Sequence, residues 1–283
     1  MSHGNLAGMI GDQVATGWLT SLDVNAAFDR PWVDEAVAWL LATAAGPVID
    51  VGCGGGGATA AFAHHTDVVA LDRDPRLIEV ARRRADAEGV AGRVRWATGE
   101  VGRLPVGAQT FGVVWASGVV HHVADQQAAV GELAGLARPG GTVALVEGGL
   151  PLRCLPHEIG LGRPGLEARL DEARARWFED LRAELHGPPL PYGWPEALAR
   201  AGLVDRRSRS FVVEATPTLD AVGQAIALQH LTNGLDELGD RLASDDRAVL
   251  RRLVDPDDEA WVGHRDDLLV TAVRTVHVGT RPV

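Results

Sequence analysis

The chain has 283 residues, a formal net charge of −11, and a balance of 46% hydrophobic to 23% charged residues. A chain of this length and composition buries a full hydrophobic core, so we expect a globular protein that is a single domain overall. All 27 basic residues are arginine, which excludes a Walker-type phosphate loop, a pyridoxal Schiff base and a lysine nucleophile.

The same composition bounds the partners and the compartment. The acidic balance disfavours nucleic acid, because phosphate binding needs a concentrated basic surface. The longest apolar stretch, residues 36–49, is interrupted and shorter than the roughly 20 residues of a membrane span, so we expect no membrane partner. Only Cys53 and Cys154 occur, and residues 1–13 lack the pattern of a signal peptide, so we expect a cytoplasmic protein. Arginine, alanine and glycine in place of lysine suggest a bacterial gene.

Residues 1–45 are expected to form an N-terminal helical cap. Residues 31–41 have helical spacing, with Asp29 as the capping residue and Pro31 in the first turn.

From residue 47 to residue 148, apolar strand-like runs alternate with helical stretches. The expected helices cover residues 58–64, 76–88 and 126–137. This alternation predicts an α/β fold with a doubly wound, Rossmann-like sheet of parallel strands. Such a sheet binds ligands at the carboxyl ends of its strands, so residues 46–150 form the expected cofactor-binding core.

A glycine loop directly follows the first strand, residues 48–51. Gly52, Gly54 and Gly57 allow positive φ and let backbone N–H groups approach a polar ligand. The same spacing satisfies the dinucleotide fingerprint, and Asp72, which ends the next strand, suits the ribose of a dinucleotide or of S-adenosylmethionine. The loop alone therefore leaves both cofactors open.

Two carboxylates favour S-adenosylmethionine. Asp50 stands two residues before the first glycine, where it would repel a pyrophosphate and attract the ammonium of the aminoacyl end. Glu100 follows the strand-like residues 94–97, where an acid accepts a hydrogen bond from the exocyclic amine of adenine.

Further motifs follow in order: residues 111–117, then His121-His122-Val123, then residues 136–146 with their Arg-Pro-Gly-Gly turn. Together with the glycine loop they resemble the class I S-adenosylmethionine-dependent methyltransferase family. The resemblance implies S-adenosylmethionine as cofactor, with its methionine part over the loop, its ribose on Asp72 and its adenine beside Glu100. The expected cofactor-binding residues are Asp50, Gly52, Cys53, Gly54, Asp72, Arg73, Glu100, Val101, Ser117 and His122.

The sequence departs from the family pattern at Gly112, where many relatives carry an aspartate. Two alternatives stay open at this point. A NAD-dependent oxidoreductase would use the same loop and Asp72, although it does not explain Glu100 or the Arg-Pro-Gly-Gly turn. A non-methylating S-adenosylmethionine-binding protein or cyclase on the same fold would share every cofactor contact.

Residues 151–195 lie outside the minimal core and are expected to form a helical insertion. Leu166, Leu170 and Leu181 belong to a series at helical spacing, between flanks rich in proline and glycine. An insertion after the fifth strand emerges at the cofactor edge of the sheet, so we expect a lid over the acceptor pocket. Residues 196–283 are expected to complete the core, with a second helical insertion at 219–253 and a last strand at 268–278.

His121 and His122 follow the fourth strand, whose end borders the reacting methyl group in this fold. A base with a near-neutral pKa removes a proton from a hydroxyl, amine or acidic carbon, and histidine suits that task. We therefore expect both to be catalytic, with His121 towards the acceptor and His122 towards the cofactor. Adjacent histidines without a local acid triad do not predict a metal site.

Eight tryptophans against one tyrosine suggest an aromatic-lined pocket. The expected pocket residues are Trp18, Trp32, His157, Trp177 and Trp194. The expected partner is a small, partly apolar acceptor from specialised metabolism, methylated on oxygen, nitrogen or carbon.

Overall fold

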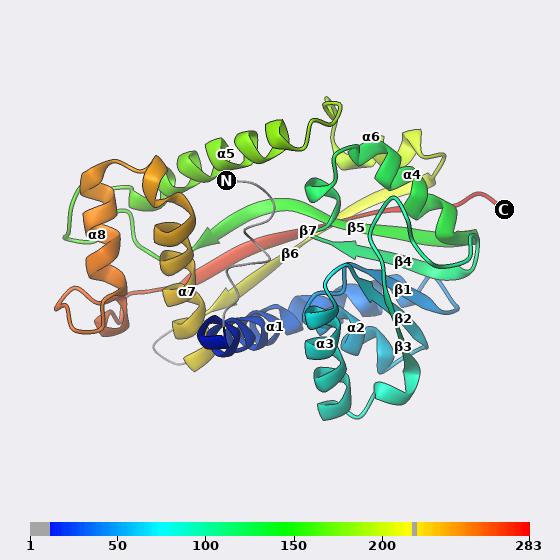
Figure 1. Cartoon of the computed structure of the whole chain (residues 1–283), viewed down its shortest axis with the longest axis horizontal. Coiled ribbons are helices and arrows are strands. Elements are labelled where there is room, and N and C mark those ends of the chain that lie inside the picture. The colour runs from blue at the N-terminus through cyan, green and yellow to red at the C-terminus, as the bar shows by residue number, and fades with distance from the viewer. Residues whose placement is uncertain (1–11, 217–219) are drawn as a thin grey trace.

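The computed structural model describes residues 12–216 and 220–283, with side chains described from residue 21 onward. Its centre is a seven-stranded sheet in the order β3-β2-β1-β4-β5-β7-β6 (Figure 1). Neighbouring strands from β3 to β5 pair in parallel, whereas β7 runs antiparallel to both β5 and β6. The strands are β1 (Val48–Val51), β2 (Val68–Asp72), β3 (Val94–Thr98), β4 (Phe111–Ser117), β5 (Ala137–Arg153), β6 (Val204–Ala215) and β7 (Val270–Thr280).

Helices cover both faces of this sheet. Helices α1, α2, α3 and α7 pack on one face, and α4 and α6 pack on the other (Figure 1). The α-helices are α1 (Asp12–Leu41), α2 (Gly57–Ala63), α3 (Pro75–Ala87), α4 (Gln126–Leu136), α5 (Leu166–Glu184), α6 (Trp194–Arg200), α7 (Ala221–Leu238) and α8 (Ser244–Val254). Short 3-10 helices are η1 (Ala91–Arg93), η2 (Val120–His122), η3 (Gly239–Arg241) and η4 (Val262–His264). Within the described ranges, no helix combines the length and apolar character that crossing a membrane requires.

Capping residues fix the start of the helices that flank the site. The Asp74 carboxylate accepts the backbone N–H of Arg76 at 2.9 Å, with proline in the first turn of α3. Asp125 does the same for α4, where its Oδ1 accepts the N–H of Ala128 at 2.9 Å. The observed bounds of α2, α3 and α4 lie within one residue of the expected ones, and the predicted α/β fold is confirmed.

β1 is the point at which the strand order reverses. It pairs in parallel with β2 on one side and with β4 on the other, and all four of its residues are buried. The connections that leave β1 and β4 run on opposite faces of the sheet, so a crevice opens beyond the carboxyl ends of these two strands. The glycine loop stands at that crevice.

Helix α1 corrects the expected start of the N-terminal helix. The helix runs unbroken from Asp12 to Leu41 with Pro31 inside it, so Asp29 is not its cap. Instead, Asp29 accepts a hydrogen bond from Trp32 Nε1 at 2.8 Å. Buried residues on both sides of the proline, Phe28 and Val33 among them, hold the helix on the sheet, and this packing outweighs the missing N–H.

β5 is far longer than the apolar run at residues 142–146 that follows the Arg-Pro-Gly-Gly turn. Its part up to Val146 pairs with β4, and from Thr142 to Arg153 it pairs with the antiparallel β7, with shifts of register between Val146 and Gly149 and between Leu150 and Arg153. Beyond the end of β4, the ribbon of β5, β7 and β6 continues towards α5, α7 and α8, which pack against one another (Figure 1).

Candidate functional site

A cavity of about 500 Å³ lies at the carboxyl ends of β1, β2 and β4. Its wall comes from four segments that are distant in sequence: the glycine loop, the end of β2, the loop after β3 and the loop after β4. Of the residues expected to bind a cofactor, those that line it are Gly52, Gly54, Asp72, Arg73, Glu100, Val101, Ser117 and His122.

The glycine loop reaches this cavity in a backbone conformation that glycine favours. Gly52, Gly54 and Gly56 have positive φ, whereas Gly57, which we expected to have it, begins α2 instead. A Cβ on Gly52 would lie 2.4 Å from Cγ2 of Val119, so the loop after β4 packs directly on this position. At Gly54, the described structure holds no atom within 4 Å of such a Cβ, which leaves the loop open to the cavity.

Asp72 is held in place by backbone donors on both sides. Its Oδ2 accepts the N–H of Gly54 at 3.0 Å, and its Oδ1 accepts the N–H of Asp74 at 2.9 Å. The side chain is buried apart from the part that faces the cavity. These bonds orient a carboxylate towards a ligand before any ligand binds.

Glu100 is exposed in the loop that follows β3, where it lines the same cavity. That loop is anchored by Glu132 of α4, whose carboxylate accepts the N–H groups of Gly102 at 2.5 Å and Leu104 at 3.2 Å. The loop also meets the end of β2, because the N–H of Gly99 donates to the carbonyl of Asp72 at 3.1 Å. Asp72 and Glu100 therefore stand on backbone segments that are hydrogen-bonded to each other.

A second, smaller cavity of about 210 Å³ lies between α1 and the glycine loop. It holds the remaining expected cofactor residues, Asp50 and Cys53, and it shares Gly52, Gly54 and Ser117 with the first cavity. The loop therefore contributes to the wall of both cavities.

Asp50 is a buried carboxylate at the end of β1, only 2% exposed. Its Oδ2 accepts the hydroxyl of Thr59 at 2.5 Å. Burial, opposed by the Thr59 bond and supported by the negative charge of Asp72, raises the pKa of Asp50 to about 7. The carboxylate is thus poised to ionise when a cation arrives.

Cys53 is a buried thiol beside two carboxylates. Burial, followed by the charges of Asp50 and Asp72, raises the pKa of Cys53 far above its ordinary value. The thiol stays protonated at neutral pH, so Cys53 lacks the thiolate that a nucleophile needs.

His121 is oriented by Glu147, a residue that the sequence analysis missed. The Oε2 of Glu147 lies 2.7 Å from Nδ1 of His121, and its Oε1 accepts the N–H groups of Val119 at 3.1 Å and Val120 at 2.8 Å. Glu147 is buried, directly after the core of β5. A carboxylate on Nδ1 fixes the tautomer that leaves Nε2 as the proton acceptor.

His122 lines the first cavity, and its ring centroid is 4.0 Å from that of His121. The His122 ring is exposed to the cavity, yet the protein atoms around it exclude part of the water that would solvate its charged form. This desolvation, followed by repulsion from His121 and Arg73, lowers the pKa of His122 to about 4. His122 is therefore neutral at pH 7.

Helix α5 contacts the histidine loop through two residues that the sequence analysis also missed. Arg182 donates to the carbonyl oxygens of Val123 at 2.6 Å and Ala124 at 3.0 Å. The ring of Phe178 lies 5.9 Å from that of His121. The first inserted helix thus borders the expected catalytic residues.

The four expected pocket residues whose side chains are described do not come together. Trp32 lines the second cavity and stacks on Trp115 with ring centroids 6.2 Å apart, while the side chain of Trp18 lies outside the described residues. His157 is exposed, Trp177 is half-buried on α5, and Trp194 packs at the start of α6 on the opposite face of the sheet. None of these last three lines either described cavity.

Comparison with known proteins decides the family of the core. Residues 49–145 match the family model described as a methyltransferase domain. This chain carries a class I S-adenosylmethionine-dependent methyltransferase domain. S-adenosylmethionine is the cofactor of this domain, and the glycine loop, Asp72 and Glu100 line one cavity.

The methyltransferase domain is similar to several curated proteins over part of their length. It is 31% identical over 121 residues to the ubiquinone/menaquinone biosynthesis C-methyltransferase UbiE of Dinoroseobacter shibae, covering 42% of this chain and 48% of the relative. It is 30% identical over 147 residues to the methyltransferase GfsG of Streptomyces halstedii, covering 50% and 53%. The chain thus spans about half the length of these relatives.

Solved structures share the fold at low identity. The YcgJ protein of Bacillus subtilis superposes with a TM-score of 0.52 and 18% identity, over 89% of this chain and 98% of that one. Phosphoethanolamine N-methyltransferase 2 of Haemonchus contortus, in complex with S-adenosyl-L-methionine, has a TM-score of 0.51 and 15% identity, over 88% and 53%. At these identities the likeness concerns the fold alone.

Proposed function

We propose that the protein transfers a methyl group from S-adenosylmethionine to a small, partly apolar acceptor, at an oxygen, nitrogen or acidic carbon. The observation that carries this proposal is the pairing of a preformed cofactor cavity with a carboxylate-oriented histidine after β4. S-adenosylmethionine supplies the electrophilic methyl group. The protein positions the two substrates, excludes water and removes the acceptor's proton.

The two cavities share Gly52, Gly54 and Ser117, and this supports a cofactor that extends across both of them. In our proposal the adenosine lies in the larger cavity, with its ribose hydroxyls on Asp72 and its adenine amine at Glu100. The amino-acid end extends past the backbone of Gly54 into the smaller cavity, where its ammonium lies near the Asp50 carboxylate. The ammonium then stabilises the ionised carboxylate of Asp50, which burial disfavours in the free protein.

We assign the base role to His121. Its Nδ1–H donates to Glu147 Oε2, so Nε2 holds the lone pair that takes the acceptor's proton, and the carboxylate stabilises the resulting imidazolium. His122 stays neutral and serves as a wall of the cofactor cavity. A metal is not needed for this step, because the histidine already removes the proton.

We propose that α5 and its flanking segments, residues 151–195, cover the acceptor. Phe178 supplies an aromatic surface beside His121, and Arg182 fastens the helix to the loop that carries both histidines. An apolar ring next to the base suits a partly apolar acceptor. We place the acceptor in specialised metabolism, and the relatives named as quinone C-methyltransferases make a phenolic or quinol ring a second class to screen.

Calorimetric titration with S-adenosylmethionine and, separately, with NADH tests the cofactor half. We expect micromolar affinity for S-adenosylmethionine and none for NADH. Replacing Asp72 by alanine removes a charged hydrogen-bond acceptor and is expected to weaken binding by about 10- to 100-fold. Asp67→Ala, an exposed carboxylate away from the cavity, serves as the control. A preference for NADH would contradict the proposal and restore the oxidoreductase alternative.

Mass spectrometry of reaction mixtures tests the transfer itself. Phenols, quinols, amines and carbon acids are incubated with the protein and S-adenosylmethionine, and a mass gain of one methylene unit on an acceptor is expected. Tight cofactor binding with no methylated product from any class would favour the non-methylating alternative.

A further inference from the structure

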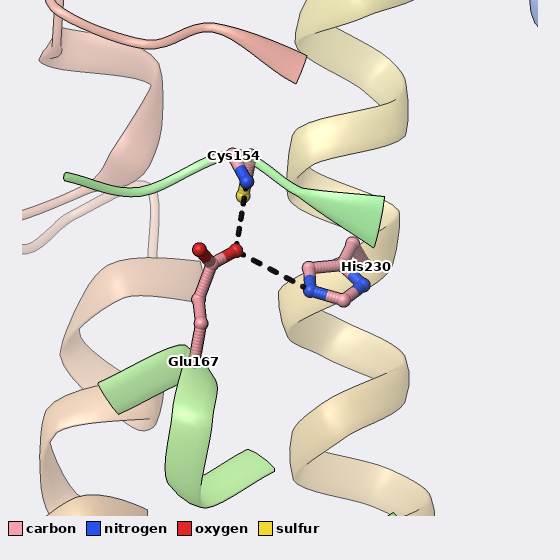
Figure 2. A group of neighbouring side chains, drawn as sticks. All are labelled: Cys154, Glu167 and His230. Atoms are coloured by element: carbon pink, nitrogen blue, oxygen red, sulfur yellow. Dashed lines mark hydrogen bonds and ion pairs between the residues drawn. The ribbon is translucent and has the colours of Figure 1, made fainter. Parts of the chain in front are cut away.

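Three metal-ligating side chains meet in the interior, away from the cofactor cavity. Cys154 follows β5 directly, Glu167 stands in the first turn of α5, and His230 lies on α7 (Figure 2). One ligand atom from each residue lies within 4.8 Å of the other two. None of the three lines either cavity described above.

The hydrogen bonding of this cluster is incomplete. Glu167 Oε1 accepts the backbone N–H of Cys154 at 2.7 Å. Nε2 of His230 is 3.6 Å from the same oxygen, too far for a hydrogen bond, and it has no partner among the described residues. The side chains of both residues are only 8% exposed. A buried ring nitrogen without a partner is rare in native proteins, and a bound ion is one of its explanations.

The charges also point to a cation. A buried carboxylate needs a positive partner, and the nearby Arg153 is already paired with Asp171. One divalent cation would be neutralised by one thiolate and one carboxylate, with the neutral imidazole as third ligand.

We propose that Cys154, Glu167 and His230 bind a divalent transition metal, for which Zn²⁺ is the best match. Sulfur, nitrogen and carboxylate oxygen together form a ligand set typical of zinc and atypical of Mg²⁺ or Ca²⁺. With zinc–ligand bonds of about 2.0–2.3 Å, tetrahedral ligand atoms lie roughly 3.5 Å apart, so the three side chains close by about 1 Å on binding. A water molecule completes the tetrahedron.

The metal would be structural. It joins the end of β5, the start of α5 and the middle of α7, which belong to the two inserted regions, and so fixes the layer that we propose covers the acceptor. The inference does not depend on methyl transfer, because metal uptake is measured without cofactor or acceptor.

The experiment titrates the chelator-stripped full-length protein with Zn²⁺ and with Co²⁺. We expect one Zn²⁺ per chain, a rise in unfolding temperature, and a thiolate-to-metal charge-transfer band with Co²⁺. Because the thiol must lose its proton, affinity should rise with pH. Loss of a true ligand, in Cys154→Ser or His230→Ala, should weaken binding by more than about 100-fold, beyond the effect of outer-shell changes.

Matched controls are His157→Ala and Glu158→Gln, exposed residues between β5 and α5, which should bind Zn²⁺ like the parent. Unchanged affinity in Cys154→Ser and His230→Ala would overturn the proposal, as would a parent protein that takes up no Zn²⁺. If the ligand variants do not fold, the Co²⁺ spectrum of the parent decides: a protein without the thiolate band has no such site, and the cluster is then only a buried polar group.

Discussion

Asp50 shows how one residue links stability to cofactor binding. A rise of its pKa from 3.8 to about 7 corresponds to a preference of about 4 kcal/mol for the neutral carboxyl in the folded protein. The folded state therefore binds one more proton than the unfolded state between these two pH values, and its stability falls as the pH rises through this window. An ammonium that arrives near Asp50 reverses the preference.

Asp50→Asn is expected to remove this pH dependence. The amide oxygen still accepts the Thr59 hydroxyl, but no charge is buried at any pH. In urea unfolding without cofactor, the stability of the variant relative to the parent should increase by up to about 4 kcal/mol from pH 4 to pH 8. Affinity for S-adenosylmethionine should fall in the same variant. A pH profile parallel to that of the parent, as expected for the exposed control Asp67→Asn, would contradict this account.

Glu147→Gln tests whether the carboxylate positions His121. Glutamine keeps an oxygen for the N–H groups of Val119 and Val120 but presents an N–H₂ group to His121, which favours the wrong tautomer. We expect kcat to fall by about 10²- to 10⁴-fold, with unchanged cofactor affinity. Partial rescue by Glu147→Asp and a changed tautomer in ¹⁵N NMR separate positioning from a general loss of structure.

At the scale of elements, the glycine loop offers a matched pair of substitutions. Both Gly52 and Gly54 have positive φ, so alanine at either is strained by about 1–2 kcal/mol. At Gly52 the new methyl group would also collide with Val119, whereas at Gly54 it would enter open space. We expect Gly52→Ala to lower the unfolding temperature more, and Gly54→Ala to weaken S-adenosylmethionine binding with the smaller loss of stability. Equal losses of unfolding temperature and of affinity in the two variants would contradict the assignment of Gly52 to packing and Gly54 to binding.

Elements in the core were predictable where local signals and tertiary packing agree. The caps Asp74 and Asp125 start their helices at the expected positions. The start of α1 was not predictable, because a proline inside a helix reads as a first turn unless the docking surface of the whole helix is known. The length of β5 was not predictable either. Two consecutive glycines, Gly148 and Gly149, are typical of the end of a strand, yet β5 continues beside β7 through them.

The whole molecule decides which residues share a site. Asp72 and Glu100 line the same cavity, as expected from sequence, because they stand at the carboxyl ends of neighbouring parallel strands and such ends converge. Glu147 was missed because its contact with His121 spans 26 residues and exists only because β4 and β5 are neighbours. Trp177 and Trp194 lie outside both described cavities, since aromatic residues in inserted segments pack on helices as readily as they line a pocket.

A ligand that binds only the folded chain stabilises the whole of it. At a free concentration of about 100 times its Kd, S-adenosylmethionine should add about 2.7 kcal/mol to the free energy of unfolding. For a chain of this size, that gain corresponds to a rise of roughly 4–5 °C in Tm, measured by differential scanning calorimetry. NADH at equal concentration should leave Tm unchanged, and Asp72→Ala should lose most of the shift. A Tm that responds to both nucleotides alike would indicate non-specific binding.

The continuity of β5 has a mechanical consequence. The layer of α5, α7 and α8 lies at the far end of strands that continue from the core (Figure 1). The pairing of β5 with β7 shifts register between Val146 and Gly149. Entry of an acceptor and release of its product would then depend on bending of the three-stranded ribbon. The ribbon would bend by small angles and return to one resting shape.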